Sequence, residues 1–344
     1  PTQRKATLVA CSRPTCNTVL TPVTSSYMSK DRPDAIVVGA GISGIAAART
    51  LQSYGHVVEV IEKGRGVGGR MATRRFAGAR FDHGAQFFTS RGSEFTKLIE
   101  NATRDGAVKK WTNGFSENPD GYARWCGSSG MTSLVKWMVA EGNINVRTAT
   151  TVTDLRDMPA NAYVLTPPVP QSLAILSFSQ MLPNPRTQIE LSAISYKPTI
   201  AILLRLEQSP ERFPEHGGVQ FLEHRDLAFI SDNQRKGISD EPALTVHLSN
   251  ELSESLWEDS DEGVLSAATA LIKDHLNGVA VTDFQIQRWR YAGPEEVRAE
   301  STIVWGANPT IALAGEAFAG PKVEGAFRSG VAAAEMINVA LSSS

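Results

Sequence analysis

The order of apolar and polar positions early in the chain predicts a strand, a helix and a second strand in close succession. Ala35–Val38 is wholly apolar, as a buried parallel strand should be. Ile42–Tyr54 carries apolar residues at helical spacing, and Gly55 follows as a stop. Val57–Ile61 is a second strand-like run that is rich in β-branched residues. This order predicts a βαβ unit.

Beyond this unit the pattern is mixed, with antiparallel character in the middle of the chain. A small apolar strand at Ile311–Ala314 and an alanine-rich amphipathic helix at Glu324–Leu341 follow, and together with the first unit they look like parts of one nucleotide domain. The fold class is therefore α/β (α+β overall), with a Rossmann-type nucleotide domain and a second, mixed-sheet domain. The other predicted elements are helices at Gly92–Thr103, Met131–Glu141 and Val264–Leu276, and strands at Ala162–Leu165, Thr199–Leu206, Leu227–Ser231 and Leu244–Ser249.

The composition is that of a globular protein with no marked charge. A chain of 344 residues with 42% apolar and 20% charged residues suits about two globular domains. A formal charge of −2 gives no electrostatic reason to expect nucleic acid or a membrane surface as a partner. The three cysteines form no disulfide framework or zinc motif, which favours a reducing compartment.

The N-terminal thirty residues differ from the rest. Pro1–Lys30 contains four basic and no acidic residues and shows no apolar periodicity, so we expect it to be disordered. Its composition fits an organellar transit peptide, but it also fits sequence upstream of a start at Met28. We therefore expect a cytoplasmic protein, or a plastid or mitochondrial one if the segment is a transit peptide.

The first glycine-rich stretch, GAGISG, has the context of a dinucleotide phosphate site. Gly39 permits the tight turn after the strand, Gly41 lets a pyrophosphate approach the backbone, and Gly44 lets the helix pack closely. Glu62 ends the second strand 18 residues after Gly44, where a carboxylate would accept the ribose hydroxyls. An acid there also argues against a 2′-phosphate on the nucleotide.

The second stretch, GRGVGGRM, also matches G-x-G-x-x-G, at Gly64, Gly66 and Gly69, but no helix pattern follows it. Because it begins just after Glu62, we expect it to lie beside the first loop. Backbone amides and the Arg70 guanidinium could then bind the same pyrophosphate. The two loops therefore predict one dinucleotide held twice.

Several stretches in order resemble the renalase family, especially its bacterial-type members, within the amine-oxidase-like flavoprotein superfamily. The similarity runs from about Asp34 to Ala340 and includes both glycine loops. The stretches that narrow it are FDHGAQFFTSR at Phe81–Arg91, RWCGSSGMTSLVKWM at Arg124–Met138, QRWRYAGP at Gln287–Pro294 and IALAGEAFAGPKVEGAFRSGVAAA at Ile311–Ala334.

The resemblance implies a non-covalent FAD enzyme that oxidises 2- or 6-dihydro-NAD(P) to NAD(P)⁺. Hydride would pass to flavin N5, and O₂ would reoxidise the flavin to give H₂O₂. The partners would be this small molecule and O₂, with no nucleic acid, membrane or metal. No catalytic triad or dyad is expected, because rearomatisation drives the transfer and the protein positions the ring. The implied domains are a tail (1–33), an FAD-binding domain (34–90, 143–170 and 300–344) and a substrate domain (91–142 and 171–299).

Taken with the glycine loops, the resemblance also implies a set of site residues. Gln287, Trp289 and Tyr291 alternate and so share one strand face, while Arg124 and Arg290 could meet substrate phosphates. The implied substrate-pocket residues are Gln86, Arg124, His247, Trp289 and Tyr291. The implied FAD-binding residues are Gly39, Ala40, Gly41, Ile42, Ser43, Gly44, Glu62, Lys63, Gly69, Arg70, Met71, Gly84, Ala85, Gln86, Val152, Thr166, Gly315, Glu316, Val323, Glu324 and Ala326.

The C-terminal motif departs from the commoner family pattern at one position. Glu316 stands where the family usually has an aspartate that contacts the ribityl chain, so its contact is open. The helix that begins near Glu324 would direct its positive N-terminus at the flavin pyrimidine edge.

Three alternatives differ in what they require. An amine oxidase would hold its amine between aromatic side chains near the flavin, and Gly315–Gly320 offers only Phe318. A pyridine-nucleotide-disulfide enzyme would need a second Rossmann unit and a C-x-x-x-x-C pair, which the sequence lacks. A flavin-free binding protein on the same fold, like the GDP-dissociation inhibitors, would be colourless when purified.

Overall fold

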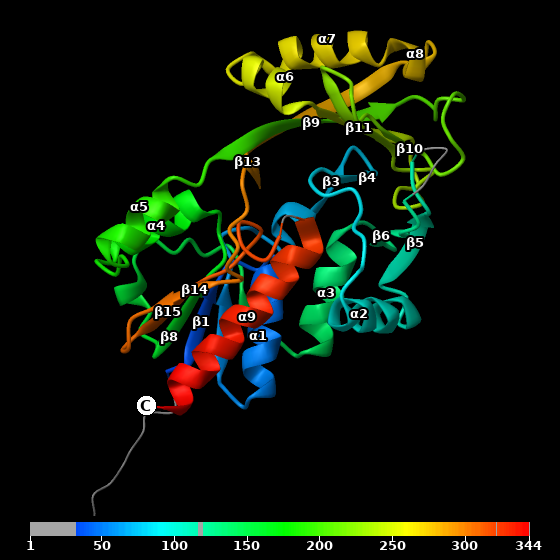
Figure 1. Ribbon diagram of the computed structural model, residues 1–344. Coiled ribbons are helices and arrows are strands. Elements are labelled where there is room, and N and C mark those ends of the chain that lie inside the picture. Colours follow the sequence, from blue (N-terminus) through cyan, green and yellow to red (C-terminus); the bar gives the residue numbers. More distant parts are fainter. Residues whose placement is uncertain (1–31, 116–119, 321, 344) are drawn as a thin grey trace, which may run out of the picture. The chain divides into compact units, whose positions relative to one another are not determined.

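The first of two main sheets has the mostly parallel topology that the N-terminal pattern predicts (Figure 1). The computed structural model describes residues 32–115, 120–320 and 322–343. Neighbouring strands of this sheet are parallel, except that the edge strand β14 runs antiparallel to β15. In sheet order the strands are β14 (Ile303–Trp305), β15 (Thr310–Leu313), β8 (Ala162–Leu165), β1 (Ala35–Val38), β2 (Val58–Ile61) and β7 (Val146–Arg147).

Helices cover both faces of this sheet. On one face α1 (Ile42–Ser53) packs along α9 (Lys322–Ser342), and α3 (Thr132–Glu141) and α2 (Ser93–Arg104) complete an apolar layer (Figure 1). On the other face α4 (Val169–Phe178) and α5 (Pro185–Ser192) cover Ile36, Val38 and their neighbours. The four residues of β1 are buried from both sides, which is why this strand is apolar throughout.

The second sheet is antiparallel throughout, in the order β10-β11-β12-β9-β13. Helices α6 (Asn250–Ser255), α7 (Asp261–Leu271) and α8 (Lys273–Leu276) pack on one face of it over a separate apolar core (Figure 1). The strands are β10 (Gly218–Gln220), β11 (Leu227–Asp232), β12 (Ala243–Leu248), β9 (Tyr196–Leu206) and β13 (Val281–Pro294).

Several short elements lie in the chain between β2 and β8 of the first sheet. Two hairpins are antiparallel pairs of strands, and two single turns are 3₁₀ helices. They are β3 (Thr73–Phe76) with β4 (Ala79–Asp82), β5 (Val108–Thr112) with β6 (Arg124–Gly127), and the turns η1 (Gly69–Met71) and η2 (Leu155–Asp157).

The predicted fold class and the βαβ unit are confirmed, and most predicted elements occur within a few residues of their expected bounds. The single helix expected over Val264–Leu276 is wrong in detail, because the helix breaks at Ile272 and resumes as α8. Of β13 only the stretch around Gln287–Tyr291 was expected as a strand, and the pattern did not predict the two hairpins, β7, β10, β14 or the helices α4, α5 and α6. Polar residues occupy much of β13, which leaves no continuous apolar run to mark a strand.

The structure does not test two further expectations. The division into an FAD-binding and a substrate domain remains a prediction, since residues 33–344 form one compact unit. The tail, with Cys11 and Cys16, lies outside the described residues. Among the described helices, none has the length and apolar character needed to cross a bilayer.

A substitution at the α1–α9 contact should destabilise the fold. A Cβ on Gly330 would overlap the carbonyl oxygen of Ser43, a backbone atom that cannot move aside on its own. We expect Gly330→Ala to lower the free energy of unfolding by about 1–3 kcal/mol, as overpacking of cores does. Urea denaturation would measure it, with Gly66→Ala, whose Cβ meets open space, as the control. Equal stability of the two variants would contradict this contact.

Candidate dinucleotide site and the cavity beside it

The two glycine loops contact each other, as their positions in the sequence suggested. The N–H of Gly68 donates to the carbonyl oxygen of Ala40 at 2.9 Å, and Gly41 and Gly68 form an isolated β-bridge. Gly69 lies equally near, since a Cβ built on it would be 3.4 Å from the Cα of Gly41. The second loop therefore lies beside the first.

Each glycine of the first loop has a distinct steric role. Gly39 has a φ of +100°, a conformation that other residues rarely adopt. A Cβ on Gly44 would overlap the carbonyl oxygen of Gly39, so glycine allows α1 to start close to β1. Gly41 differs, because no atom lies within 4 Å of a Cβ built on it. The open side of Gly41 faces a cavity that its backbone also lines.

The start of α1 offers donors to a bound anion. Gly41 is the N-cap of α1 and has no side chain to satisfy the first backbone N–H groups. The Ser43 hydroxyl is buried and has no hydrogen-bond partner in the structure, although its residue lines the cavity. A phosphate oxygen in the cavity would satisfy these groups, and the helix N-terminus would favour its negative charge.

Glu62 occupies the place that a ribose-binding acid needs. Its carboxylate is 9% exposed at the end of β2. Oε2 accepts a hydrogen bond from the N–H of Ala40 at 2.8 Å, and Oε1 accepts one from Gly64 at 2.6 Å. A carboxylate has about four acceptor sites, so two remain for hydroxyl groups.

The cavity has a volume of about 1030 Å³ and runs from these loops to β13. That is large enough for a dinucleotide with a smaller molecule beside it, given typical ligand sites of about 300–1,000 Å³. The predicted residues that line it are Gly39, Gly41, Ile42, Ser43, Glu62, Lys63, Gly69, Arg70, Met71, Gly84, Ala85, Val152, Thr166, His247, Trp289, Tyr291, Gly315, Glu316, Val323 and Ala326.

The remaining predicted site residues do not line the cavity. Ala40 and Gly44 belong to the first loop, but their backbones contact Glu62 and Gly39 and not the cavity. The Glu324 carboxylate instead accepts hydrogen bonds from the N–H groups of Arg91 and Gly92, at 3.0 and 2.6 Å, just before α2.

Two predicted substrate-pocket residues also lie outside the cavity lining. The Arg124 guanidinium pairs with Asp120 at 2.8 Å and stacks on Phe87, so it does not reach the cavity. Gln86 is buried, and its amide nitrogen donates to the carbonyl oxygens of Asp82 and Gly84 at 2.5 and 3.2 Å. Gln86 borders the cavity only indirectly, through a 3.4 Å contact between its Nε2 and Nε2 of His247.

Arg70 and Glu316, from opposite ends of the sequence, meet at the cavity wall. Their side chains form a bidentate ion pair, and the guanidinium also donates to the carbonyl oxygen of Tyr291 at 3.1 Å. The longer glutamate at 316 thus has a clear partner within the chain. A phosphate contact of Arg70 and a ribityl contact of Glu316 remain predictions.

The far wall of the cavity is built around Trp289 on β13. Its indole N–H donates to the carbonyl oxygen of His83 at 2.7 Å, and the two rings stack with centroids 5.3 Å apart and planes 6° apart. The side chain of Gln287, two residues away on the same strand face, accepts a hydrogen bond from Arg74 at 2.7 Å. Neither His83 nor Arg74 was among the predicted site residues, although His83 stands within the FDHGAQFFTSR stretch; Arg74 lies on β3, outside the quoted stretches.

Two histidines near this wall are neutral over most of the physiological pH range. Burial, followed by the nearby Arg74 charge, lowers the pKa of His83 to about 4. Burial also lowers the pKa of His247 to about 4, against a hydrogen bond from its ring to the backbone of His83 that raises it. No group of three or more His, Cys, Asp or Glu residues in the described part of the chain is arranged to hold a metal ion.

Comparison with known families identifies both parts of this arrangement. Residues 37–101 match the model of an NAD(P)-binding Rossmann-like domain. Residues 132–338 match the model of flavin containing amine oxidoreductase, over more than half of the chain.

Individual relatives are similar over shorter stretches or at low identity. Polyamine oxidase 1 of Oryza sativa subsp. japonica is 49% identical over 61 residues, which are 17% of this chain and 12% of that protein. The chain therefore matches about an eighth of the length of such curated relatives.

Solved structures cover nearly the whole chain. Cyclohexylamine oxidase from Brevibacterium oxydans IH-35A aligns with a TM-score of 0.60 and 15% identity over 90% of this chain and 100% of that one. A protein from Exiguobacterium sp. 255-15, provisionally assigned as a protoporphyrinogen oxidase, aligns with a TM-score of 0.67 and 16% identity over 91% and 99%. At these identities the likeness shows the fold alone.

A large side chain at Gly41 should remove cofactor binding without unfolding the protein. Because a Cβ at Gly41 meets no protein atom, Gly41→Leu should fold but fill the space beside the first turn of α1. The purified variant should lack the visible absorbance of a flavin and keep the wild-type far-ultraviolet circular dichroism. A variant that retains a full complement of flavin would contradict the phosphate site.

The two histidines also predict how stability depends on pH. Their folded pKa values of about 4 lie below the unfolded value of 6.5, so the unfolded state binds protons first. Stability should therefore fall as the pH drops from about 6.5 towards 4, by up to about 3 kcal/mol for each ring. Denaturation of wild-type and H83Q/H247Q protein across this range would measure it. The same slope in both proteins would contradict the assignment.

Proposed function

The chain belongs to the flavin containing amine oxidoreductase family, and on that premise we propose that it is an FAD-dependent oxidase that converts 2- or 6-dihydro-NAD(P) to NAD(P)⁺. Bound FAD would supply the chemistry, by accepting hydride at N5 and passing the electrons to O₂ to form H₂O₂. The residues of this chain bind and orient both molecules and exclude water.

The charge of the cavity lining is the observation that carries the proposal. Its carboxylates are Glu62 and Glu316, and both already have partners. Its cationic side chains outnumber them, even though Arg70 pairs with Glu316, Arg288 pairs with Asp261 and Arg290 stacks on Trp257. The cationic residues are Lys63, Arg70, Arg288, Arg290 and Lys322. Such a lining favours ligands with phosphate groups, which FAD and a dinucleotide substrate both carry. Glu316 is paired with Arg70, and the FAD ribose would occupy the open acceptor sites of Glu62, so neither carboxylate of this lining would remain for a cationic polyamine.

The wall around Trp289 suits a flat, uncharged ring. Trp289 is held by its hydrogen bond to His83 and by the stacked imidazole, so its indole presents a fixed planar surface. His247 beside it is neutral at physiological pH and can exchange a hydrogen bond with a carboxamide. A dihydronicotinamide has both the flat ring and the carboxamide. No acid–base residue is required, because the substrate loses hydride and becomes aromatic.

The cofactor contacts follow from the first half of the site. The N–H groups at the start of α1 and the Ser43 hydroxyl would bind the pyrophosphate, and Glu62 would accept the adenosine ribose hydroxyls. The first turn of α9, which includes Val323 and Ala326, lines the cavity opposite and brings a second positive helix end to it.

An amine oxidase is the second candidate, and the relatives favour it. Cyclohexylamine oxidase shares the fold, and polyamine oxidase 1 is 49% identical over 61 residues. An amine in its neutral form could bind against Trp289 and Tyr291, which line the same wall. The two candidates differ in the substrate that reduces the flavin.

Anaerobic mixing separates the two candidates. We expect rapid loss of flavin absorbance with 2- or 6-dihydro-NAD(P), and slow or no loss with ordinary 4-dihydro-NADH or a panel of amines. Stopped-flow absorbance would measure the rates. Rapid reduction by an amine with none by the dihydronicotinamide isomers would replace this proposal by the amine oxidase.

Loss of the planar wall should weaken substrate binding more than flavin binding. Trp289→Leu removes the indole and its hydrogen bond to His83, and we expect KM to rise about tenfold, the equivalent of about 1.4 kcal/mol of lost contact. Trp289→Phe keeps a flat ring, so its KM should lie between those of the wild type and Trp289→Leu. Steady-state kinetics on flavin-saturated protein would measure both. An unchanged KM in Trp289→Leu would remove Trp289 from the substrate site.

A further inference from the structure

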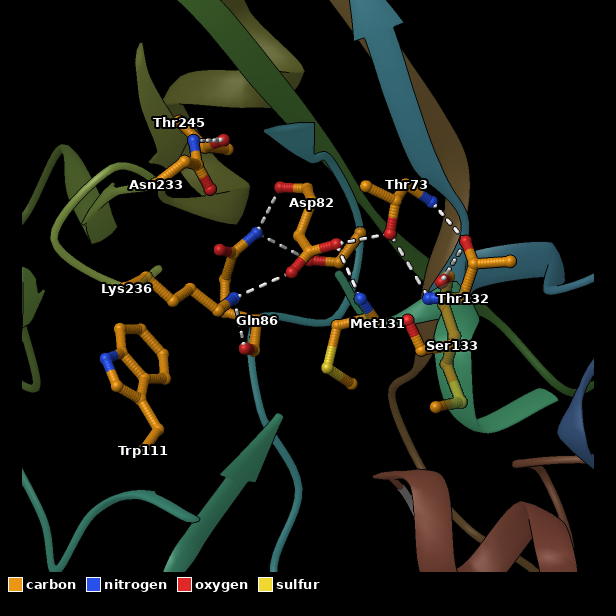
Figure 2. A network of polar contacts seen from close by, with 12 residues as sticks. Thr73, Asp82, Gln86, Trp111, Met131, Thr132, Ser133, Asn233, Lys236 and Thr245 are labelled. Carbon is orange, nitrogen blue, oxygen red and sulfur yellow. Dashed lines mark hydrogen bonds and ion pairs between the residues drawn. The ribbon is translucent and has the colours of Figure 1, made fainter. Parts of the chain in front are cut away.

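A fully buried ion pair lies behind the cavity and lines none of it. Nζ of Lys236 is 2.8 Å from Oδ2 of Asp82, and neither side chain has any exposed surface. Figure 2 shows the pair within a network of polar contacts. Burial of two charges is costly unless each is fully hydrogen-bonded, so a pair in this position calls for a reason.

The ammonium group of Lys236 has a partner for each of its three N–H bonds. Besides the Asp82 carboxylate it donates to the carbonyl oxygen of Gln86 at 2.6 Å, and it lies 4.5 Å from the centre of the Trp111 ring (Figure 2). Lysine therefore makes two directed hydrogen bonds and one cation–π contact in a site without water contact.

The Asp82 carboxylate is equally well satisfied. Its Oδ1 accepts hydrogen bonds from the Thr73 hydroxyl at 2.6 Å and from the N–H of Met131 at 2.8 Å. These partners come from β3 and from the residue before α3, so Asp82 is held by the elements that flank the first sheet. Lys236 is thus paired with a carboxylate whose position is fixed by its other hydrogen bonds.

The two residues that Lys236 contacts bracket one short loop. Residues 82–86 begin at Asp82 and end at Gln86, and the Gln86 amide closes the loop by donating to the carbonyl oxygen of Asp82. Between them, Gly84 and Ala85 line the cavity, and the N–H of Ala85 donates to the carbonyl oxygen of Arg70 at 2.9 Å. His83 in the same loop supports Trp289.

Lys236 itself is held by the second sheet. It lies in the turn after β11, where Oδ1 of Asp232 accepts from the N–H groups of Gln234 and Arg235, both at 3.0 Å. The N–H of Lys236 donates to the carbonyl oxygen of Asp232 at 2.9 Å. The ammonium therefore joins a turn of the antiparallel sheet to the loop that borders the cavity.

We propose that Lys236 is a positioning residue, which holds the 82–86 loop against the second sheet and so fixes the part of the cavity wall formed by Gly84, Ala85 and the Trp289 support. The effect on turnover rests on the proposed function, while the effect on the loop does not. The relevant contact is the hydrogen bond to the Gln86 carbonyl, and Asp82 serves to make the buried charge tolerable.

Two neutral double variants isolate that hydrogen bond. D82N/K236Q removes both charges and keeps an amide that can donate to the Gln86 carbonyl, whereas D82N/K236M removes both charges and the donor. Lys109→Met is the matched control, because Nζ of Lys109 donates to the carbonyl oxygen of Gly237 in the same turn, at 2.8 Å, without contacting the loop.

Hydrogen–deuterium exchange of the flavin-loaded proteins gives the readout. We expect the amides of residues 83–87 to exchange about five- to tenfold faster in D82N/K236M than in D82N/K236Q, the factor that one lost hydrogen bond is worth. The visible circular dichroism of the bound flavin should change in the same variant, and kcat should fall more than KM rises. In Lys109→Met both the exchange and the spectrum should match the wild type.

Equal exchange in the two double variants would overturn the proposal, as would the same increase in Lys109→Met. If D82N/K236M does not fold, amide exchange of the wild-type protein in low concentrations of urea is the deciding measurement. If a buried contact holds the loop, the exchange of residues 83–87 should rise with urea in parallel with that of β12. Fast exchange of these residues that does not depend on urea would contradict the proposal. The exchange and circular dichroism measurements need no substrate, so a failure of dihydronicotinamide turnover would count against the proposed function alone.

Discussion

The close approach of α1 to the end of β1 is the constraint on which the rest of the molecule depends. Glycine at 39 and 44 lets the helix start against the strand, and this directs the first N–H groups of α1 into the cavity. The same helix packs along α9 through Gly330, so both helix ends that border the cavity are set by backbone contacts without side chains between them. The second glycine loop and Glu62 then close around the same space.

The sequence predicts this half of the molecule well, because its signals are local. A four-residue apolar strand, a glycine turn and an acid at the end of the next strand all lie within about thirty residues. The helix and strand bounds there agree with the structure to within a residue, and the two loops touch as their order suggested.

The substrate half was less predictable, because its contacts join residues that are far apart in sequence. Trp289 was expected in the pocket, but its support by His83 depends on the pairing of β13 with β9 and on the 82–86 loop. Arg124 was expected at the substrate, yet its guanidinium forms an ion pair with Asp120, a residue only four positions away. Lys236 has no motif around it, and only the folded chain shows that its charge is buried.

The cationic lining has a further consequence for the end of a catalytic cycle. A dihydronicotinamide ring is uncharged, and the aromatic nicotinamide that forms from it carries a positive charge. The wall that holds the ring is made of an indole and a neutral imidazole, and the Glu316 carboxylate beside it is already paired with Arg70. Under the proposed function the nicotinamide ring of the product is therefore bound less favourably than that of the substrate. Oxidation of the ring thus favours release of NAD(P)⁺.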